Sequence, residues 1–342
     1  MKEELLDWLA CPDCGGDLSI EAGESVGGEV KTGTLRCEAG DHRFSIRGFV
    51  PRFVGEDDYA DAFDVEWNEF RTAHLRSFTG LDYLERQMRG AVDFPLERLE
   101  GKLVLDAGCG LGRFTEVCLD YGARVVGFDL TGAIDAAHAN LHGREGAFFI
   151  QADVFRLPLK RELFDFVFSS GVLHHTPDPP RAFAQLPPLV KPGGKLMVFV
   201  YSSYNKLYFA TTDLYRRLTT RLPKRLLLKL CYVAVPLYYV SKIPIVGPLI
   251  TRILLPVSVR PPTHRWRVGN TFDLYSPKYA FRYTHVEVHE WFRRAGLEEI
   301  TPVAPDSGVT YVAVKPPEGD EWSHRPPAAG ATRGRPEVPL PG

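Results

Sequence analysis

The chain has 342 residues, of which 25% are charged and 44% are hydrophobic, and its formal net charge is -2. These values are typical of a globular protein with one large domain and appendages, and they exclude an overall electrostatic attraction to nucleic acid or to an anionic membrane. The first residues are acidic and lack the apolar region of a signal peptide, so we expect a cytoplasmic protein whose 6 cysteines are reduced.

The first chemical pattern along the chain is a pair of thiols spaced Cys-x-x-Cys, at Cys11 and Cys14. Cys37 and His42 offer a second pair, so the four side chains would form a Cys₃His tetrahedral zinc site. Residues 18–36, between the pairs, predict a hairpin with a glycine-rich tip. The alternative is a reduced Cys-x-x-Cys without metal. A redox role is less favoured, because no thioredoxin-like βαβ pattern surrounds the first pair.

Residues 55–100 predict a helical linker that caps the following domain, and they begin with an acidic stretch. Three aromatic side chains recur there at roughly helical intervals and favour packing against a sheet: Trp67, Phe70 and Phe78. Because active-site lids commonly close from such flanks, the same segment could instead line a ligand pocket. The candidates for that alternative are Tyr59, Trp67 and Arg71.

Residues 102–106 form an apolar strand pattern that ends in Asp106 and enters a turn containing Gly108, Gly110 and Gly112. A strand, turn and helix of this kind let a ligand lie against bare backbone. The spacing Gly-x-Gly-x-Gly differs from the Gly-x-Gly-x-x-Gly of a dinucleotide site. A carboxylate at the mouth of the turn would repel a pyrophosphate, but it would suit a cation such as the α-amino group of a methionine moiety.

A second strand pattern ends in Asp129, about 20 residues further on, where an acid can hydrogen-bond ribose hydroxyls. Helical patterns at residues 113–121 and 181–190 alternate with further strands. This alternation predicts a parallel sheet covered by helices on both faces. The remaining strands are residues 148–153, ending in Asp153; residues 164–169, running into Ser170; and residues 196–201, after a turn at residues 191–195.

These motifs together resemble those of a known family. The stretches LDAGCGLGRFT, VVGFDLT, QADVFRLP, FDFVFSSGVLHHTPDP and LVKPGGKLMVFV are similar to the successive motifs of class I S-adenosylmethionine-dependent methyltransferases, in the subgroup with quinone- and small-molecule-methylating enzymes. The resemblance covers roughly residues 101–201 and resumes at residues 279–314. It implies a Rossmann-like, seven-stranded, mostly parallel sheet with helices on both faces. Its last two strands, residues 298–303 and 309–314, would pair antiparallel.

Residues 1–54 resemble the zinc-ribbon module found ahead of some methyltransferases, including a family that methylates guanine in ribosomal RNA. They are also similar to the small Trm112-like proteins that partner methyltransferases. Near the other end, Thr284 and Glu287 form a capping box that begins a helix, and Gly296 ends it.

The resemblance implies a role in S-adenosylmethionine binding for each strand end. Asp106 and the backbone of residues 108–112 would hold the methionine moiety, Asp129 the ribose and Asp153 the adenine amino group. The full set of expected cofactor residues is Asp106, Gly108, Cys109, Gly110, Gly112, Asp129, Leu130, Asp153, Val154, Ser170 and Gly171.

The methyl acceptor should lie above Ser170 and Gly171, because ligands of open α/β sheets bind at the carboxyl ends of the strands. His174 and His175 follow on the same loop, and either could deprotonate a hydroxyl or amine acceptor. His175 is the first candidate for this catalytic role. The alternative is that the histidine packs structurally at the start of the next helix.

Residues 202–275 predict a helical insertion that is both basic and apolar. Asp213 is the only acid among residues 202–270, and the net charge there is +11. The apolar runs are too short and too often broken by proline to span a membrane. The insertion is therefore a lid over the pocket, a contact with an anionic membrane surface, or, less favoured, a contact with RNA. Its cations are Lys206, Arg216, Arg217, Arg221, Lys224, Arg225, Lys229, Lys242, Arg252, Arg260, Arg265 and Arg267.

The sequence therefore predicts a methyltransferase that acts on a small-molecule or lipid-like acceptor by in-line transfer. It would be cytoplasmic, with peripheral contact to the membrane if the insertion binds lipid. The alternatives are an RNA base methyltransferase and a non-catalytic scaffold that keeps the fold. The three acids at strand ends favour an enzyme. The expected regions are a zinc-ribbon module (1–54), a helical cap (55–100), a cofactor-binding core (101–201), the insertion (202–275), the end of the core (276–315) and a disordered tail (316–342).

Overall fold

The computed structural model describes residues 1–55, 71–73, 75–204, 206–303 and 308–317. Seven strands form the core that the sequence predicts. They are β7 (Leu103–Ala107), β8 (Arg124–Asp129), β9 (Ala147–Gln151), β10 (Phe164–Ser170), β11 (Val190–Tyr201), β12 (Glu298–Val303) and β13 (Gly308–Val314). Their order is β9-β8-β7-β10-β11-β13-β12, with β13 antiparallel to both neighbours and the other core pairs parallel. The predicted Rossmann-like core is confirmed.

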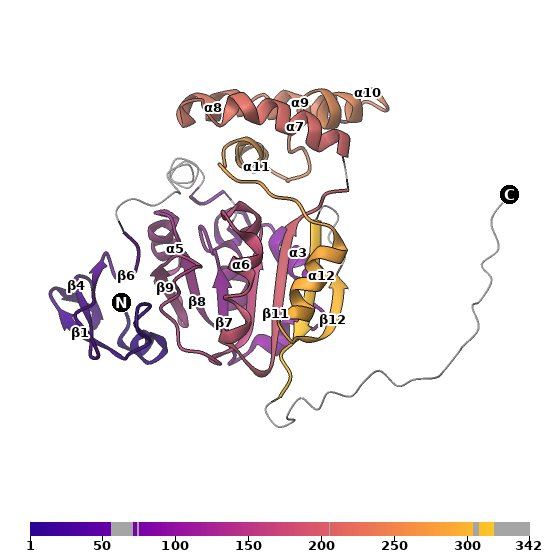
Figure 1. Ribbon diagram of the computed structural model, residues 1–342. Coiled ribbons are helices and arrows are strands. Elements are labelled where there is room, and N and C mark those ends of the chain that lie inside the picture. The colour runs from indigo at the N-terminus through magenta and orange to yellow at the C-terminus, as the bar shows by residue number, and fades with distance from the viewer. Residues whose placement is uncertain (56–70, 74, 205, 304–307, 318–342) are drawn as a thin grey trace, which may run out of the picture.

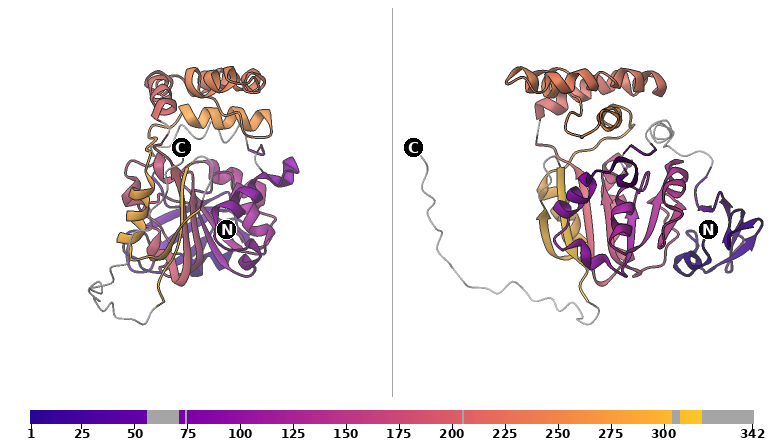
Figure 2. Two further views of the ribbon diagram at one scale, coloured as in Figure 1. Left: turned by 90° about the vertical axis from the view of Figure 1, so that its right-hand side faces the viewer. Right: turned by 180° about the vertical axis from the view of Figure 1, so that it is seen from behind.

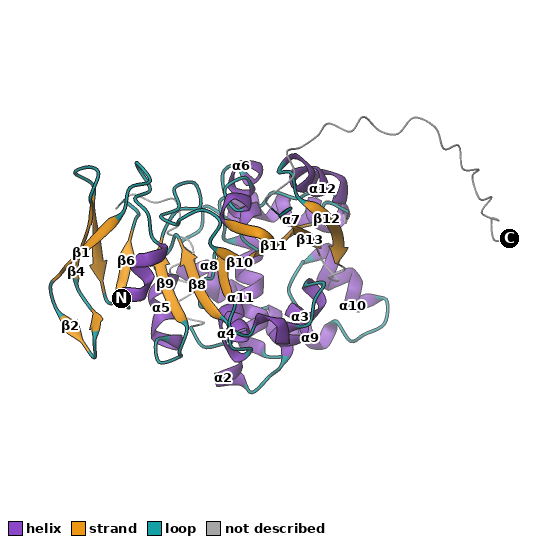
Figure 3. Ribbon diagram, turned by 90° about the horizontal axis from the view of Figure 1, so that it is seen from below, coloured by secondary structure: helices purple, strands orange, loops and turns teal. Residues whose placement is uncertain are grey.

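The sheet is larger than the seven strands expected, because the N-terminal module extends it to eleven. The elements of the N-terminal module are η1 (Glu3–Trp8), β1 (Leu18–Ala22), β2 (Ser25–Val26), β3 (Glu29–Val30), β4 (Gly33–Cys37), β5 (Arg43–Arg47) and β6 (Val50–Arg52). β1 and β4 form the predicted hairpin, and β2 pairs with β3 near its tip. β6 lies parallel to β9, through Arg52 and Gln151, so the strands continue in one row (Figure 3).

Helices cover both faces of the core, as expected for a parallel sheet whose strands are buried on both sides (Figure 1). One apolar cluster joins one face to α3 (Tyr83–Ala91), α4 (Arg113–Asp120) and α5 (Ala133–Leu141). A second cluster joins the other face to α6 (Pro179–Phe183) and α12 (His285–Arg294). The predicted capping box is present at the start of α12. The sheet is therefore the middle layer of three.

The N-terminal segment takes the place of a helix on that second face. Among residues 152–163, between β9 and β10, no helix is present. Trp8 packs edge-on against Phe148 of β9 at 4.7 Å between ring centroids, and Leu9 forms a β-bridge with Leu159. Because Leu5, Trp8 and Leu9 share an apolar cluster with the core strands, the module is fused to the core rather than tethered to it.

Two local predictions differ from the structure. The helix expected at residues 181–190 is only α6, followed by the short 3-10 helix η4 (Pro187–Leu189). Pro187 and Pro188 cannot donate the backbone hydrogen bonds of a longer helix. The turn expected at residues 191–195 lies inside β11, which begins at Val190 and carries a register shift opposite β10.

The aromatic linker also differs from its prediction. Trp67 and Phe70, like the pocket candidate Tyr59, lie outside the described residues. Phe78, expected in the core, is 59% exposed on the four-residue helix α2 (Arg76–Thr79). Polar contacts hold α2, because the backbone amides of its first two residues donate to the buried carboxylate of Glu116. An apolar anchor at Phe78 is therefore unnecessary. The short helix η2 (Leu96–Leu99) then leads into β7.

The insertion forms two helical layers above the carboxyl ends of the core strands (Figures 1 and 2). Its elements are α7 (Lys206–Thr219), α8 (Lys224–Cys231), α9 (Ala234–Val240), α10 (Val246–Pro248), the π-helix η5 (Leu249–Leu254) and α11 (His264–Tyr275). α11 packs against α7, α8 and α9 and lies between them and the sheet. Within the described ranges, no helix has the length and apolarity needed to cross a membrane.

Candidate functional site

The predicted site residues come together where β7, β8 and β9 end. Asp106 is the fourth residue of β7, Asp129 is the last of β8, and Asp153 follows β9 by two positions. Parallel pairing in register aligns these ends, with Ala107 opposite Phe128 and Asp129 opposite Gln151. Three carboxylates thus share one edge of the sheet.

The glycine-rich turn follows β7 and is tied to the end of β8. The backbone φ angles are +82° at Gly108, +54° at Gly110 and +82° at Gly112, in the left-handed region that favours glycine. The amides of Gly108 and Cys109 both donate to the carbonyl of Phe128 at 2.9 Å. A Cβ at Gly108 would lie 2.4 Å from Val172, so the backbone there must stay bare.

Asp106 is buried below this turn. Its Oδ2 accepts a hydrogen bond from Thr115 Oγ1 at 2.6 Å. Burial raises the pKa of Asp106 to about 7, and the hydrogen bond from Thr115 opposes that rise. The charge of Arg113 also lowers the pKa of Asp106, but no described residue forms an ion pair with this carboxylate. A ligand ammonium group would form one.

Asp129 and Asp153 organise the neighbouring loops. Asp129 Oδ2 accepts from the Gly110 amide at 2.9 Å, and its Oδ1 accepts from the amide and hydroxyl of Thr131 at 2.9 and 2.7 Å. Asp153 Oδ1 accepts from the amide of Phe155 at 3.0 Å. Leu130 and Val154 follow these two acids directly on the same loops. Asp129 therefore joins the glycine turn to the loop after β8.

The loop after β10 carries Ser170, Gly171 and the two histidines. Gly171 has a φ of +81°, and its amide donates to Phe199 at 3.2 Å. His174 is completely buried, and its ring packs at a tilt of 32° against Tyr201 with 3.8 Å between centroids. Neither of its ring nitrogens has a hydrogen-bond partner among the described residues. Burial lowers the pKa of His174 well below its ordinary value, so this ring is neutral.

His175 belongs to a polar group that sequence reasoning missed. Its Nδ1 lies 2.8 Å from the carbonyl oxygen of Tyr279, and its Nε2 lies 3.8 Å from Asp273 Oδ1. The hydroxyl of Tyr201 donates to Asp273 Oδ2 at 2.9 Å. Burial lowers the pKa of His175, while Asp273 opposes that shift. The one sequence feature that could have indicated this group was Tyr201, a polar aromatic residue that ends a predicted strand at the carboxyl edge of the sheet. Asp273 reaches the group only because α11 folds back over the sheet.

Three cations of the insertion point inward, contrary to the expectation of a solvated or ligand-binding basic face. The guanidinium of Arg216 donates to the carbonyls of Leu274 and Pro277 at 2.9 and 2.5 Å. Arg267 donates to Pro261 at 3.1 Å, and Lys224 Nζ lies 2.8 Å from the carbonyl of Ser276. The two arginines are buried. The carbonyls that Arg216 and Lys224 contact are 52 to 61 positions away along the chain, so helical pattern alone could not find these contacts.

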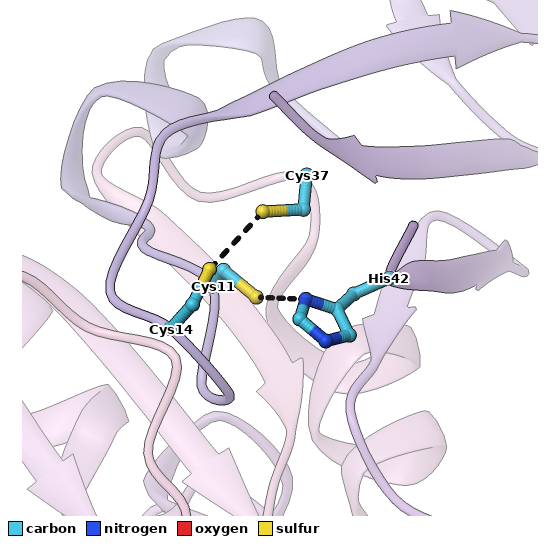
Figure 4. A group of neighbouring side chains, drawn as sticks. All are labelled: Cys11, Cys14, Cys37 and His42. Carbon is cyan, nitrogen blue, oxygen red and sulfur yellow. Dashed lines mark hydrogen bonds between the residues drawn. The ribbon is translucent and has the colours of Figure 1, made fainter. Parts of the chain in front are cut away.

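A second site lies in the N-terminal module, where Cys11, Cys14, Cys37 and His42 converge (Figure 4). Their ligand atoms all lie within 4.8 Å of one another. Cys14 Sγ is 3.3 Å from Cys37 Sγ, and Cys11 Sγ is 3.3 Å from His42 Nδ1. A tetrahedral zinc ion with bonds of about 2.0–2.3 Å needs ligand atoms roughly 3.3–3.8 Å apart, and the two pairs at 3.3 Å have that spacing.

The turn that carries the first thiol pair is built for this convergence. The Cys11 amide donates to Gly16, and the Gly15 amide, with φ +75°, donates back to Cys11, both at 2.8 Å. A Cβ at Gly16 would lie 3.4 Å from the sulfurs of Cys14 and Cys37 and 2.9 Å from the Ala39 side chain. The chain thus closes tightly around the four ligand atoms.

Comparison with known families matches both parts of the chain. Residues 105–198 match the family described as "Methyltransferase domain", and residues 2–48 match "Trm112p-like protein". The chain therefore combines a methyltransferase domain with a Trm112-like N-terminal domain.

Among curated relatives, the ubiquinone biosynthesis O-methyltransferase of Coxiella burnetii is 31% identical over 158 residues, which are 45% of this chain and 64% of that protein. The protein of the same name from Nitrosococcus oceani is 38% identical over 114 residues, 32% of this chain and 48% of that one. The chain thus spans less than two thirds of the length of these relatives.

Similar folds occur among solved structures. A Haloferax volcanii complex that contains the Trm112 methyltransferase activator is 18% identical, with a TM-score of 0.44, covering 77% of this chain and 100% of that one. A SAM-dependent methyltransferase from Aquifex aeolicus is 13% identical, with a TM-score of 0.40, covering 76% and 100%. Both scores lie below 0.5, so neither likeness decides what this chain binds.

Proposed function

We propose that this chain is an S-adenosylmethionine-dependent methyltransferase that acts on a small-molecule or lipid-like acceptor. The observation that carries the proposal is the bare glycine turn between the buried carboxylate of Asp106 and the strand-end carboxylate of Asp129. A dinucleotide pyrophosphate would lie against the carboxyl group of Asp106, whereas the ammonium group of an amino acid joined to a nucleoside would be complementary to it, and Asp129 is placed to accept from the ribose. The matched methyltransferase domain supports this choice.

The cofactor supplies a methyl group on a positively charged sulfur, which an acceptor atom attacks in line. The protein has to hold donor and acceptor together and exclude water. We assign the methionine moiety to Asp106 and the Gly108–Gly112 turn, including Cys109, and the ribose to Asp129 beside Leu130. We assign the adenine to Asp153 and Val154. Ser170 and Gly171 would face the donor methyl from the end of β10.

We assign the acceptor side to His175, Asp273 and Tyr201. His175 Nε2 lies 3.8 Å from Asp273 Oδ1, and Asp273 retains 30% of its side-chain exposure. The name of the relatives, O-methyltransferase, favours a hydroxyl acceptor, whose proton His175 would take. His174 has no exposed atom, so a packing role beneath Tyr201 fits it better than contact with an acceptor.

The N-terminal cluster is proposed to hold one structural zinc ion. Three thiolates and one imidazole are the donor set of closed structural sites, which leave no position for a substrate. The ion would fix the turn at Cys11 and Cys14 against the end of β4 and thereby the edge of the extended sheet.

Calorimetric titration with S-adenosylmethionine tests the proposed function. Asp129→Ala removes the ribose acceptor and an anchor of the glycine turn, so affinity should fall by about 2–3 kcal/mol, since hydrogen bonds to charged groups are worth about that much. Glu145→Ala is the matched control, because Glu145 is an exposed acid in the turn that enters β9 at its opposite end. Undiminished affinity in the Asp129 variant, or no binding by the wild type, would remove the cofactor assignment.

A further inference from the structure

The outer layer of the insertion exposes an unusual amount of apolar side chain. Of the 19 large hydrophobic side chains that are exposed among the described residues, 15 lie between Tyr204 and Leu254. Patches of this kind on a globular protein usually mark an interaction surface. Tyr204 stacks on His285 of α12. The other 14 residues, called here the outer apolar face, are Leu207, Leu214, Tyr215, Leu218, Leu226, Leu230, Tyr232, Val233, Tyr239, Ile243, Ile245, Val246, Leu249 and Leu254.

The apolar residues of α7 form a stripe along one side of the helix. Leu207, Leu214 and Leu218 are spaced by seven and four residues, which places them on one side at 3.6 residues per turn. Their exposed fractions are 57, 61 and 65%. The buried side chains of Thr212 and Arg216 lie on the opposite side of α7. The leucine stripe therefore faces away from the protein.

α8 repeats this arrangement with different residues. Leu226 and Leu230 are four residues apart and exposed, and Val233, just beyond the end of α8, is exposed too, whereas Leu227 and Leu228 are buried in a small apolar cluster with α11. Because α11 already fills the inner side of both helices, the outer stripes have no core to join. Their burial requires something outside the described chain.

The same surface carries cations beside the stripes and almost no negative charge. Arg225 and Lys229 of α8 precede Leu226 and Leu230 by one position, which puts them on the flank of that stripe. The single acid of the layer, Asp213, is neutralised by two hydrogen bonds of 2.7 Å from Arg282. The exposed cations of the outer layer are Lys206, Arg217, Arg221, Arg225, Lys229, Lys242 and Arg252.

We propose that the outer apolar face docks on the surface of an anionic lipid bilayer, with its leucine and isoleucine side chains in the interface and its cations among the headgroups. Bulky aliphatic side chains with flanking lysine and arginine are the composition of helices that lie in a membrane interface. A nucleic acid would need charge without exposed aliphatic stripes, and a second copy of the same cationic surface would meet repulsion.

Co-sedimentation tests this proposal, using phosphatidylcholine vesicles with graded phosphatidylglycerol content and the full chain. The wild type should sediment increasingly as the anionic fraction rises, and added salt should reduce the binding. Arg225→Gln with Lys229→Gln should weaken binding by roughly fivefold per charge, the value of one cation at an anionic surface. Arg86→Gln with Arg98→Gln is the matched control, because it removes two exposed cations from the region before β7.

A second pair of variants separates apolar insertion from simple charge attraction. Leu214→Gln with Leu230→Gln should lower vesicle binding at least tenfold, and the loss should persist at high salt. Val286→Gln is the control, since Val286 is 78% exposed on α12 outside the outer face. Circular dichroism and S-adenosylmethionine titration check that the folded core is unchanged in each variant.

Three outcomes would overturn the proposal. The wild type could stay in the supernatant at every lipid composition, or the leucine variants could bind as well as the wild type. Light scattering could instead reveal a dimer that the leucine variants dissociate while vesicles remain unbound. Vesicle binding is measured without cofactor or acceptor, so its failure leaves the methyltransferase proposal unaffected.

Discussion

The two appendages of the core meet it in opposite ways. The N-terminal module buries its apolar side chains against β9 and has one exposed large hydrophobic residue, Val26, among residues 1–55. The insertion buries one side of its helices and leaves 15 such residues exposed. Both are attached to the same sheet, one at its edge and the other above its carboxyl ends (Figure 1).

This difference separates a part that completes the fold from a part that offers a surface. The module adds strands to the sheet and covers a part of its face on which the core has no helix. Its apolar side chains are therefore buried within the chain. The insertion contributes Asp273 to the polar group around Tyr201 and then presents a second, unsatisfied side. Exposure of apolar area on that scale has a free-energy cost, which a partner surface would remove.

The largest effect should come from removing the proposed metal from the module. Elemental analysis should find one zinc ion per chain in the wild type and none in Cys14→Ser, because a serine hydroxyl is a poor zinc ligand. Structural zinc contributes roughly 10–16 kcal/mol in zinc-finger peptides near pH 7, so hydrogen exchange should increase throughout residues 1–54. Cys118→Ser, in a buried cysteine of α4, is the control and should retain the metal. Zinc retained by Cys14→Ser would contradict the site.

The second largest effect is a difference in the free energy of unfolding between variants of one aromatic residue from each appendage. Trp8→Ala should cost about 3–5 kcal/mol in the free energy of unfolding, because the ring is 7% exposed and packs on Phe148. Tyr239→Ala should stay within about 0.5 kcal/mol, since that side chain is 70% exposed. Urea denaturation of both variants measures the contrast. Equal costs would show that the outer face of the insertion is buried in the free protein.

At the proposed cofactor site, in the core between the two appendages, ligand affinity should depend on pH. The pKa of Asp106 is raised to about 7 by burial, so the carboxyl is increasingly protonated below that pH and must lose its proton to pair with an ammonium group. Affinity for S-adenosylmethionine should therefore fall as pH falls, roughly tenfold between about pH 8 and pH 6. Asp106→Asn should bind weakly and without this dependence. A flat profile in the wild type would contradict the role of Asp106.

The smallest effect should come from the ion pairs that rim the module. Lys160 Nζ lies 3.1 Å from Asp17 Oδ1, but both side chains are largely exposed. Asp17→Asn should change the free energy of unfolding by less than about 1 kcal/mol, the usual value for such pairs. Thermal unfolding at low and high salt checks this. A larger loss would mean that the module is held by charge and not by the apolar contacts around Trp8.

The sequence determined what depends on local pattern. Neighbouring residues set the position of Asp106 near the end of β7 and of Asp129 at the end of β8. They also set the positive φ angles of Gly108 and Gly112 and the cap at Thr284. Spacing also predicted the Cys and His residues that converge on one point. These features persist because backbone conformation and alternation of apolar residues are set within a few positions along the chain.

Tertiary structure decided what depends on contacts between distant segments. Asp273 accepts a hydrogen bond from Tyr201, 72 positions away in the sequence. Arg216 donates its hydrogen bonds to the carbonyls of Leu274 and Pro277 instead of facing solvent. The N-terminal segment covers β9 because no helix precedes β10 to do so. The net charge of the insertion, counted from the sequence, does not tell which cations are buried and which are exposed to solvent. Only packing against α11 divides its helices into a buried side and an exposed one.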